Sequence, residues 1–405
     1  MPPDLSATSR PGMGRSIALL VVVQIAAMSL WFVSAAILPE MTAEAALSPA
    51  RAAALSTAVQ VGFFLGALLL AVHGTADRFD PRRVLALSAL LAAGSNAALL
   101  VVPPGSDAQV LLRGATGMLL AGVYPVGMKI AVGWSLARRG TLVGLVVGAL
   151  TLGSAAPYLM ALLGGPDWRL TVMLASAAAV AAAGLVLLVG LGPHHAVAPR
   201  FDPSAVQLAW RIRRVRLACA GYLCHMWELY AFWAWIATAT ALSFAPRLGE
   251  EAGLTAARLL AVAAIALGAL LCVPAGQLAD RLGKARIAGI CMAVSALAAF
   301  GTAASFGGAP WVMALCVLVW GAFIIPDSAQ FSALVADAAP PERAGSLMTL
   351  QTALGFLLTT VSVQGTPIAA EHLGWPLTLA LLGIGPCLGV EAMRRLTRAD
   401  QPVDR

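Results

Sequence analysis

The sequence predicts an all-α membrane protein in which twelve transmembrane helices form two pseudo-symmetric six-helix bundles. The first reason is composition: 60% of the 405 residues are hydrophobic and 11% are charged, whereas a soluble domain carries about a quarter charged residues. The second is that the apolar residues occur in long runs between polar loops. The third is that one acid-and-base motif occurs once in each half of the chain.

Each predicted span is a continuous apolar run of about 20 residues, the length that a helix needs to cross a bilayer. Continuous runs predict helices, because the strands of a membrane barrel alternate in polarity. In chain order the predicted spans are residues 16–38, 51–73, 84–103, 108–133, 140–164, 168–191, 215–245, 255–278, 286–306, 310–335, 345–370 and 374–393.

The spans divide into two bundles, residues 16–191 and 215–393. Residues 192–214 contain His194 and His195, prolines and several arginines, and they are predicted to form a polar cytoplasmic linker. The two histidines have no partner at metal-ligand spacing, so we assign them to this linker. Short polar cytoplasmic tails are predicted at residues 1–15 and 394–405.

Basic residues predict the orientation of the spans. With both ends of the chain on one side, 20 of the 26 Lys and Arg residues fall on that side. The opposite side carries Arg51, Arg169, Arg247 and Arg258. Cytoplasmic loops carry an excess of Lys and Arg, so both termini are predicted to be cytoplasmic. The frequent Arg, Ala, Gly and Leu favour a bacterial inner membrane.

Several classes of function are excluded by what the sequence lacks. The six cysteines form no CxxC pair, and no His lies at metal-ligand spacing. No nucleophile elbow or phosphate loop is present, so we expect no enzyme activity, cofactor or metal. The pI near 9.5 follows from basic inner loops, and no nucleic-acid partner is expected. We expect a monomer in contact with lipid.

Two sequence features are repeated about half a chain apart. Residues 76–83 read Ala-Asp-Arg-Phe-Asp-Pro-Arg-Arg, and residues 279–286 read Ala-Asp-Arg-Leu-Gly-Lys-Ala-Arg. Span 4 contains Tyr124-Pro125, and span 10 contains Ile325-Pro326 at nearly the same offset. Proline removes a backbone hydrogen bond and bends a helix. A duplicated protein that moves solutes across a bilayer has such repeats.

These motifs resemble those of the major facilitator superfamily over essentially the whole chain. Residues 276–284 fit its loop signature Gly-x-Leu-Ala-Asp-Arg-x-Gly-Arg-Arg closely, whereas the first copy is degraded, with His73 and Thr75 at the Gly and Leu positions. Residues 113–117 are similar to the family pattern Arg-x-x-Gln-Gly, with Thr116 in place of Gln. Residues 148–157 lack the Gly-Pro pair of the family's proton antiporters, and the nitrate-porter signatures are absent.

The resemblance implies transport by alternating access, with spans 1, 4, 7 and 10 lining a central cavity. It also implies that the acid of each loop motif caps a helix end and pairs with an arginine of a neighbouring helix. The implied gating residues are Asp77, Arg78, Arg82, Asp280, Arg281 and Lys284.

Span 7 is the richest in polar groups. His225 and Glu228 are one turn apart, and Trp235 lies two turns further along the same face. A charge at the bilayer centre is costly, so Glu228 is a candidate proton carrier with His225 as its relay. The alternative is a structural ion pair or a hydrogen bond to a neighbouring helix.

Other polar residues within the spans are candidates for substrate binding or coupling. Arg113 in span 4, with Tyr124 on the same face, suits an anionic solute or a switchable salt bridge; gating or packing are alternatives. Asp327 in span 10 belongs to the inner gate, the coupling path or a solvated helix end. Gln24 and Trp31 in span 1 are candidate cavity groups. Three amides are assigned to contacts between helices: Gln60, Asn96 and Gln351.

The predicted function is secondary active transport of a small organic solute, coupled to protons through Glu228. One alternative is an anion facilitator or exchanger that is organised by Arg113 and has no proton coupling. A second is a multidrug efflux antiporter. A third, from a different class, is a membrane sensor or scaffold that does not transport.

Overall fold

The computed structural model describes residues 12–73, 78–135, 139–165, 167–194, 205–340 and 343–399. Every regular element in these ranges is a helix. Twelve helical stretches are long enough and apolar enough to cross a bilayer, which confirms the predicted number of spans. The predicted gating residue Asp77 lies outside the described residues.

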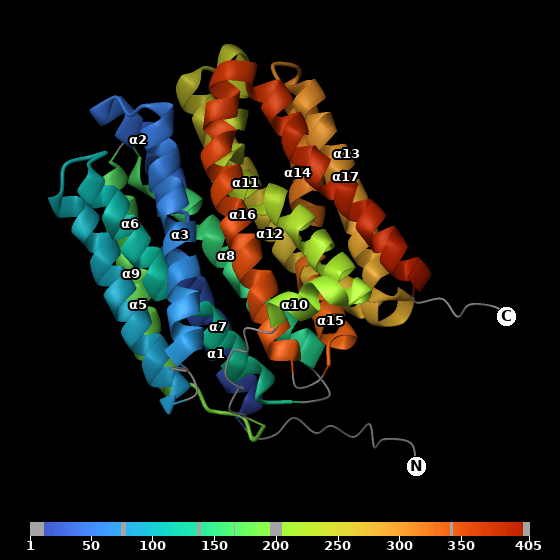
Figure 1. The fold of residues 1–405 in the computed structure, drawn as a ribbon. Helices are drawn as coiled ribbons and strands as arrows, with labels where there is room; N and C mark the ends of the chain where they lie inside the picture. Colours follow the sequence, from blue (N-terminus) through green and yellow to red (C-terminus); the bar gives the residue numbers. More distant parts are fainter. Residues whose placement is uncertain are drawn as a thin grey trace.

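The first six spans form one half of the molecule (Figure 1). Their elements are α1 (Met13–Met28) with α2 (Val33–Ala45), α3 (Pro49–His73), α5 (Pro81–Ala97) with η1 (Ala98–Val101), α6 (Asp107–Leu120) with α7 (Tyr124–Val132), α8 (Arg139–Gly164), and α9 (Trp168–Leu185) with η2 (Val186–Leu188).

The last six spans form the second half, beside the first. Their elements are α11 (Arg213–Leu248), α12 (Glu250–Leu282), α13 (Lys284–Ser305), α14 (Pro310–Ile324) with α15 (Ser328–Ala338), α16 (Ala344–Leu373) and α17 (Trp375–Ala399). The start of α1 and the end of α17 lie at the same end of the molecule (Figure 1).

Two boundaries differ from the sequence prediction. Residues 205–211, expected to be linker, form the short helix α10 (Ala205–Arg211). Helices α11 and α12 contain 36 and 33 residues and extend beyond their predicted spans. An apolar run marks only the part of a helix that lies in hydrocarbon, and the charged turns at its ends can continue the helix into water.

Three spans are discontinuous. Span 4 is interrupted at residues 121–123, directly before Tyr124-Pro125, and span 10 is interrupted at residues 325–327, around Pro326. Both proline bends are therefore confirmed, in the same helix of each half. Span 1 is also interrupted, at residues 29–32, where the sequence has no proline and no break was predicted.

Close helix packing is repeated in the two halves. A Cβ atom added to Gly62 of α3 or Gly117 of α6 would lie 1.9 or 2.0 Å from a backbone oxygen of the facing helix. In the second half, a Cβ added to Gly268 of α12 or Gly321 of α14 would lie 2.4 or 2.5 Å from such an oxygen. Only glycine permits these approaches. Spans 2 and 4 therefore pack as spans 8 and 10 do, which supports the duplication.

The two halves meet mainly along two helix pairs, α3 with α16 and α8 with α12. Span 2 thus faces span 11, and span 5 faces span 8, so the pairing is symmetric between the halves. The side chains that fill the middle of this interface are largely aromatic.

Candidate transport pathway

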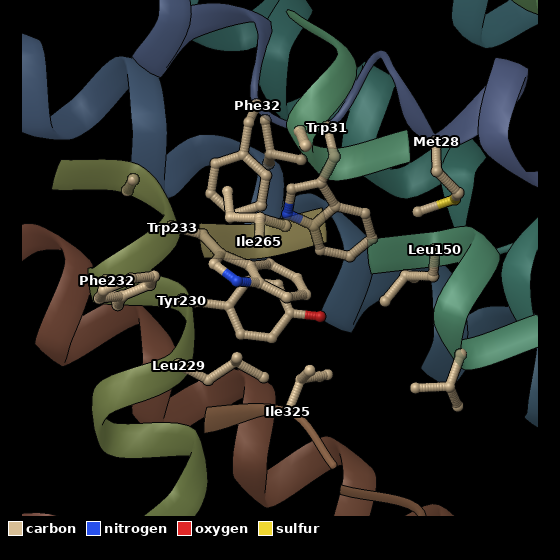
Figure 2. Packing of buried hydrophobic residues seen from close by; sticks show 14 of the residues in the cluster. Met28, Trp31, Phe32, Leu150, Leu229, Tyr230, Phe232, Trp233, Ile265 and Ile325 are labelled. Atoms are coloured by element: carbon tan, nitrogen blue, oxygen red, sulfur yellow. The ribbon is translucent and has the colours of Figure 1, made fainter. Parts of the chain in front are cut away.

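Six aromatic side chains meet at the interface between the halves. We call this set the aromatic cluster: Trp31, Phe32 and Phe63 from the first half, and Tyr230, Trp233 and Phe356 from the second. Figure 2 shows Trp31 and Phe32 close to Tyr230 and Trp233 of α11. Ring centroids of contacting pairs are 4.5–6.0 Å apart, and no member is more than 5% exposed. The rings therefore fill the middle of the interface in this conformation.

The break in span 1 presents Trp31 and Phe32 to this cluster, and Arg113 of α6 contacts that break. Its Nη2 donates to the backbone oxygens of Leu30 and Trp31, at 2.9 and 2.6 Å. Its Nη1 donates to Asn96 Oδ1 at 2.8 Å. A guanidinium beside the carbonyl end of α1 also offsets the negative end of the helix dipole. Arg113 is 1% exposed, and it pairs with no carboxylate in the described part of the chain.

The break in span 4 is in turn bound by a side chain of span 1. Gln24 of α1 donates from Nε2 to the backbone oxygen of Val123, at 3.1 Å. Gly127, one turn into α7, leaves the space that this amide occupies. Span 4 therefore supplies Arg113, which binds carbonyls at the break in span 1, and span 1 supplies Gln24, which binds a carbonyl at the break in span 4.

Asn96 links the Arg113 contact to span 6, as the sequence predicted for this amide. Its Nδ2 donates to Ser176 Oγ at 3.0 Å and to the backbone oxygen of Val172 at 3.3 Å. Gln351 also makes a contact between helices, to the backbone oxygen of Phe331 at 3.4 Å. Gln60 differs, because its amide faces Ser56 and Thr57 of its own helix.

Glu228 lies inside the second half and is fully buried. Ser295 of α13 donates from its hydroxyl to the carboxylate at 2.8 Å, and Trp320 of α14 donates from Nε1 to Oε2 at 2.8 Å. Glu228 has no Lys or Arg partner among the described residues. The carboxylate therefore accepts hydrogen bonds from two neutral donors, one on each of two neighbouring helices.

His225 lies one turn from Glu228 and contacts the break in span 10. Its Nδ1 is 3.0 Å from Oδ1 of Asp327, the residue directly before α15. Both side chains are at most 1% exposed, and the imidazole packs against Phe331, with 5.5 Å between ring centroids. The structure thus brings together Glu228, His225 and Asp327 with Ser295 and Trp320, and we call this set the acid–histidine cluster.

The two clusters occupy opposite faces of α11. Glu228 and Tyr230 are two residues apart, which is a rotation of about 200° on a helix. Tyr230 contacts the first half, whereas the partners of Glu228 belong to the second. In this conformation the ionisable groups of span 7 therefore face the interior of their own bundle and do not line a central cavity.

Two further predicted site residues occupy separate positions. Trp235 donates from Nε1 to the backbone oxygen of Val363 in α16, at 2.9 Å, and is not bonded to the acid–histidine cluster. Tyr124 is the first residue of α7 and is half-buried at the break in span 4.

Bonds between the halves also occur at the end of the molecule opposite the start of α1. Arg258 of α12 pairs with Glu40 of α2, and its Nη2 donates to the backbone oxygen of Ala36 at 3.0 Å. Nearer the middle of the interface, Tyr158 of α8 donates from its hydroxyl to the backbone oxygen of Trp233, a member of the aromatic cluster. Sequence reasoning missed these residues: Arg258 was counted only as a charge on the outer side, and neither Glu40 nor Tyr158 stood out from its surroundings.

The fold and the motifs can now be compared with known proteins. Residues 19–363 match the sequence profile described as Major Facilitator Superfamily. The chain belongs to the major facilitator superfamily. Membership of this superfamily indicates a multi-pass membrane transporter and not an enzyme. A search of curated protein sequences found no match.

Solved transporters have the same fold. A bacterial homologue of the human lysosomal transporter Spinster, in an inward-facing and occupied conformation, has a TM-score of 0.73 and 12% identity, over 98% of this chain and 100% of that one. A D-xylose–proton symporter has a TM-score of 0.72 and 16% identity, over 94% and 96%. The nucleoside transporter NupG has a TM-score of 0.71 and 13% identity, over 95% and 99%.

In the described part of the first loop motif, which leaves out Asp77, Asp80 is the acid that caps a helix. Asp80 Oδ1 accepts from the backbone N–H of Arg82 at 2.9 Å and so caps α5. The Arg82 side chain hydrogen-bonds the same carboxylate, which lowers the pKa of Asp80, and it donates to the backbone oxygen of Val189 beyond η2 at 3.3 Å. Arg78 is exposed. Arg82 therefore joins the loop to span 6.

The second copy departs from the expected pairing. Asp280 lies in the last turn of α12, is exposed, and forms no ion pair in the described ranges. Arg281 is also exposed. Lys284 instead binds Asp337, with Nζ 2.5 Å from Oδ2. The expectation that Asp280 caps a helix and pairs with an arginine was wrong in this conformation, because the α12 helix continues past it and Asp337 of α15 supplies the acid.

A pocket of about 470 Å³ adjoins this second copy. Its polar lining residues are Arg214, Asp280, Lys284, Arg286, Asp337 and Thr397. All of them belong to the second half, so the pocket is not a space between the halves.

Proposed function

We propose that this protein is a secondary active transporter that moves a small organic solute across the bacterial inner membrane by alternating access, coupled to protons. The Spinster homologue, the xylose–proton symporter and NupG share its fold. Because their sequence identities to this chain are low, the substrates of these proteins are not assigned to it. The proposal therefore depends on the site itself.

The orientation follows from the loop charges. The excess of Lys and Arg at the end where α1 starts supports a cytoplasmic location for both termini. The Arg258–Glu40 pair and the bond from Arg258 to the Ala36 backbone oxygen then lie toward the outer face. Bonds between the halves at that face close the solute path from outside, and a rocking motion that opens it must break them.

The single observation that carries proton coupling is the acid–histidine cluster. A charged carboxylate within the membrane is costly and is normally paired, yet Glu228 has only the hydroxyl of Ser295 and the indole of Trp320 as partners. Uptake of a proton removes this charge. Glu228 can therefore alternate between a neutral state and a charged state within the bundle.

The His225–Asp327 pair connects this proton site to a movable element. His225 is on α11, one turn from Glu228, and Asp327 lies in the break between α14 and α15. Only a protonated His225 forms an ion pair with Asp327. A proton that moves between Glu228 and His225 would thus change how firmly α15 is held to α11.

The anion-carrier alternative has less support. The guanidinium of Arg113 is occupied by Asn96 and by the carbonyls of Leu30 and Trp31. An anionic solute would have to displace these bonds and open the span 1 break.

The test is transport by purified protein in proteoliposomes, with radiolabelled uridine, nicotinamide and D-xylose as probes. Glu228→Gln keeps the shape but cannot exchange a proton, so we expect it to abolish accumulation driven by a pH gradient while counterflow exchange continues. Glu391→Gln, which removes an exposed carboxylate on α17, is the matched control and should accumulate normally. Equal loss of accumulation and exchange in Glu228→Gln would contradict proton coupling at this residue.

A further inference from the structure

Two indole N–H groups of the aromatic cluster have no hydrogen-bond acceptor among the described residues. Trp31 is 2% exposed and Trp233 is 0% exposed, yet Nε1 of each lacks a partner. Buried indoles usually find one. Elsewhere in the second half, the indoles of Trp227, Trp235 and Trp320 all donate to a protein oxygen. Among the buried indoles of the described residues, Trp134 also lacks a partner; it follows α7 and is outside the cluster.

The two indole rings that carry these donors both pack against the ring of Tyr230. Trp31 lies 5.6 Å from the ring of Tyr230 and Trp233 lies 5.4 Å from it, between centroids. Trp31 belongs to the first half and Trp233 to the second, so a molecule that binds both would contact both halves. Figure 2 shows the Tyr230 hydroxyl directed from α11 toward Leu150 of α8, which adds a third polar group at the interface.

No ionised side chain belongs to the aromatic cluster. Glu228 is on the opposite face of α11, with partners inside the second half. The guanidinium of Arg113 is already occupied by the backbone oxygens of Leu30 and Trp31 and by the side chain of Asn96. A charged solute would therefore lose its hydration without gaining an opposite charge, whereas a neutral ring gains stacking and apolar contact.

We propose that the aromatic cluster is the solute site and that its ligand is an uncharged, ring-bearing organic molecule whose acceptor atoms bind the indole N–H groups of Trp31 and Trp233. The inference rests on the proposed transport function. The rings touch one another in this conformation, so the ligand enters when the halves separate and takes the place of contacts between rings. Proton site and solute site then lie on opposite faces of α11, and rotation or tilt of this one helix affects both.

The experiment measures binding of probes that differ in charge, by thermal stabilisation and by titration of the full-length protein in detergent. Nicotinamide and uridine are the neutral probes. Nicotinate, 1-methylnicotinamide and uridine monophosphate are their charged counterparts. We expect at least one neutral probe to bind and its charged counterparts to bind at least tenfold more weakly, roughly the value of one hydrogen bond to a buried group.

Two variants test the indole donors. Trp31→Phe and Trp233→Phe keep a ring but remove the N–H, and each should weaken binding of the neutral probe about tenfold. Trp168→Phe is the matched control, because its indole donates to Glu44 outside the cluster, and it should bind as the unchanged protein does. A thermal midpoint measured without probe verifies that each variant is folded.

Three outcomes would overturn the assignment: binding of charged probes as strong as that of neutral ones, unchanged affinity in both indole variants, or no binding of any probe. Glu228→Gln separates this inference from proton coupling. If that variant still accumulates solute with the pH gradient while neutral probes need both indoles, proton coupling at Glu228 is wrong and the solute site stands.

Discussion

Arg258 of α12 and Glu40 of α2 form a buried ion pair that joins the two halves of the molecule at the end opposite the start of α1. Their side chains are 6% and 10% exposed, and the guanidinium also binds the backbone oxygen of Ala36. A buried pair is costly to form but more costly to break on one side, because a buried charge is then left without a partner. This relationship makes the pair a lock between the two halves at that end of the molecule.

Removal of one partner of this lock should destabilise the closed conformation. We expect Glu40→Gln or Arg258→Gln to lower stability by about 3–5 kcal/mol, and the double variant to lose less than the sum of the two. Thermal midpoints of the four proteins measure this coupling. Glu44→Gln is the control and should change little. Glu44 lies on α2, as Glu40 does, but it is an exposed acid, and its partner Arg169 is on α9 of the same half. Additive effects in the double variant would show that the two residues do not act as a pair.

Arg113 should act mainly through the break in span 1. Arg113→Met removes the donors to Leu30, Trp31 and Asn96 and leaves buried carbonyls unsatisfied, which costs about 1–3 kcal/mol for each group. Arg113→Lys keeps the charge but lacks the planar fork that reaches both sides, so it should be intermediate. Thermal midpoints test this order.

The anion-carrier alternative would be favoured if the Arg113→Lys protein had normal stability but did not bind anionic probes. Arg169→Lys, a change of the same kind at an exposed ion pair, is the control for the loss of a guanidinium.

The glycine contacts between helices predict a symmetric pattern of sensitivity. Gly117→Ala and Gly321→Ala would each place a methyl group within 2.6 Å of backbone atoms on the facing helix, so the helices must separate, at a cost of about 1–3 kcal/mol or more. Gly94→Ala and Gly184→Ala meet nothing within 4 Å and should be neutral or slightly stabilising. Thermal midpoints of the four variants test the pattern, and equal tolerance at all four positions would contradict it.

Much of the architecture could be predicted because it depends on local composition. A stretch of about 20 apolar residues is favourable in a bilayer whatever its neighbours are, so the twelve spans, from residues 16–38 onward, were predictable. The prolines at Pro125 and Pro326 break helices by their own covalent structure. The break at residues 29–32 was not predictable, since it is stabilised by Arg113, 82 residues away from Trp31 in sequence.

The candidate site shows the same division. The sequence identified Glu228, His225 and Asp327 as costly within a membrane, and helix periodicity placed His225 and Glu228 on one face of span 7. It did not indicate which face meets the other half, or that Ser295, Trp320 and Glu40 are partners of charged groups. Those facts depend on the rotation and tilt of each helix against its neighbours. Packing across the whole molecule sets these angles, and only the tertiary structure decided them.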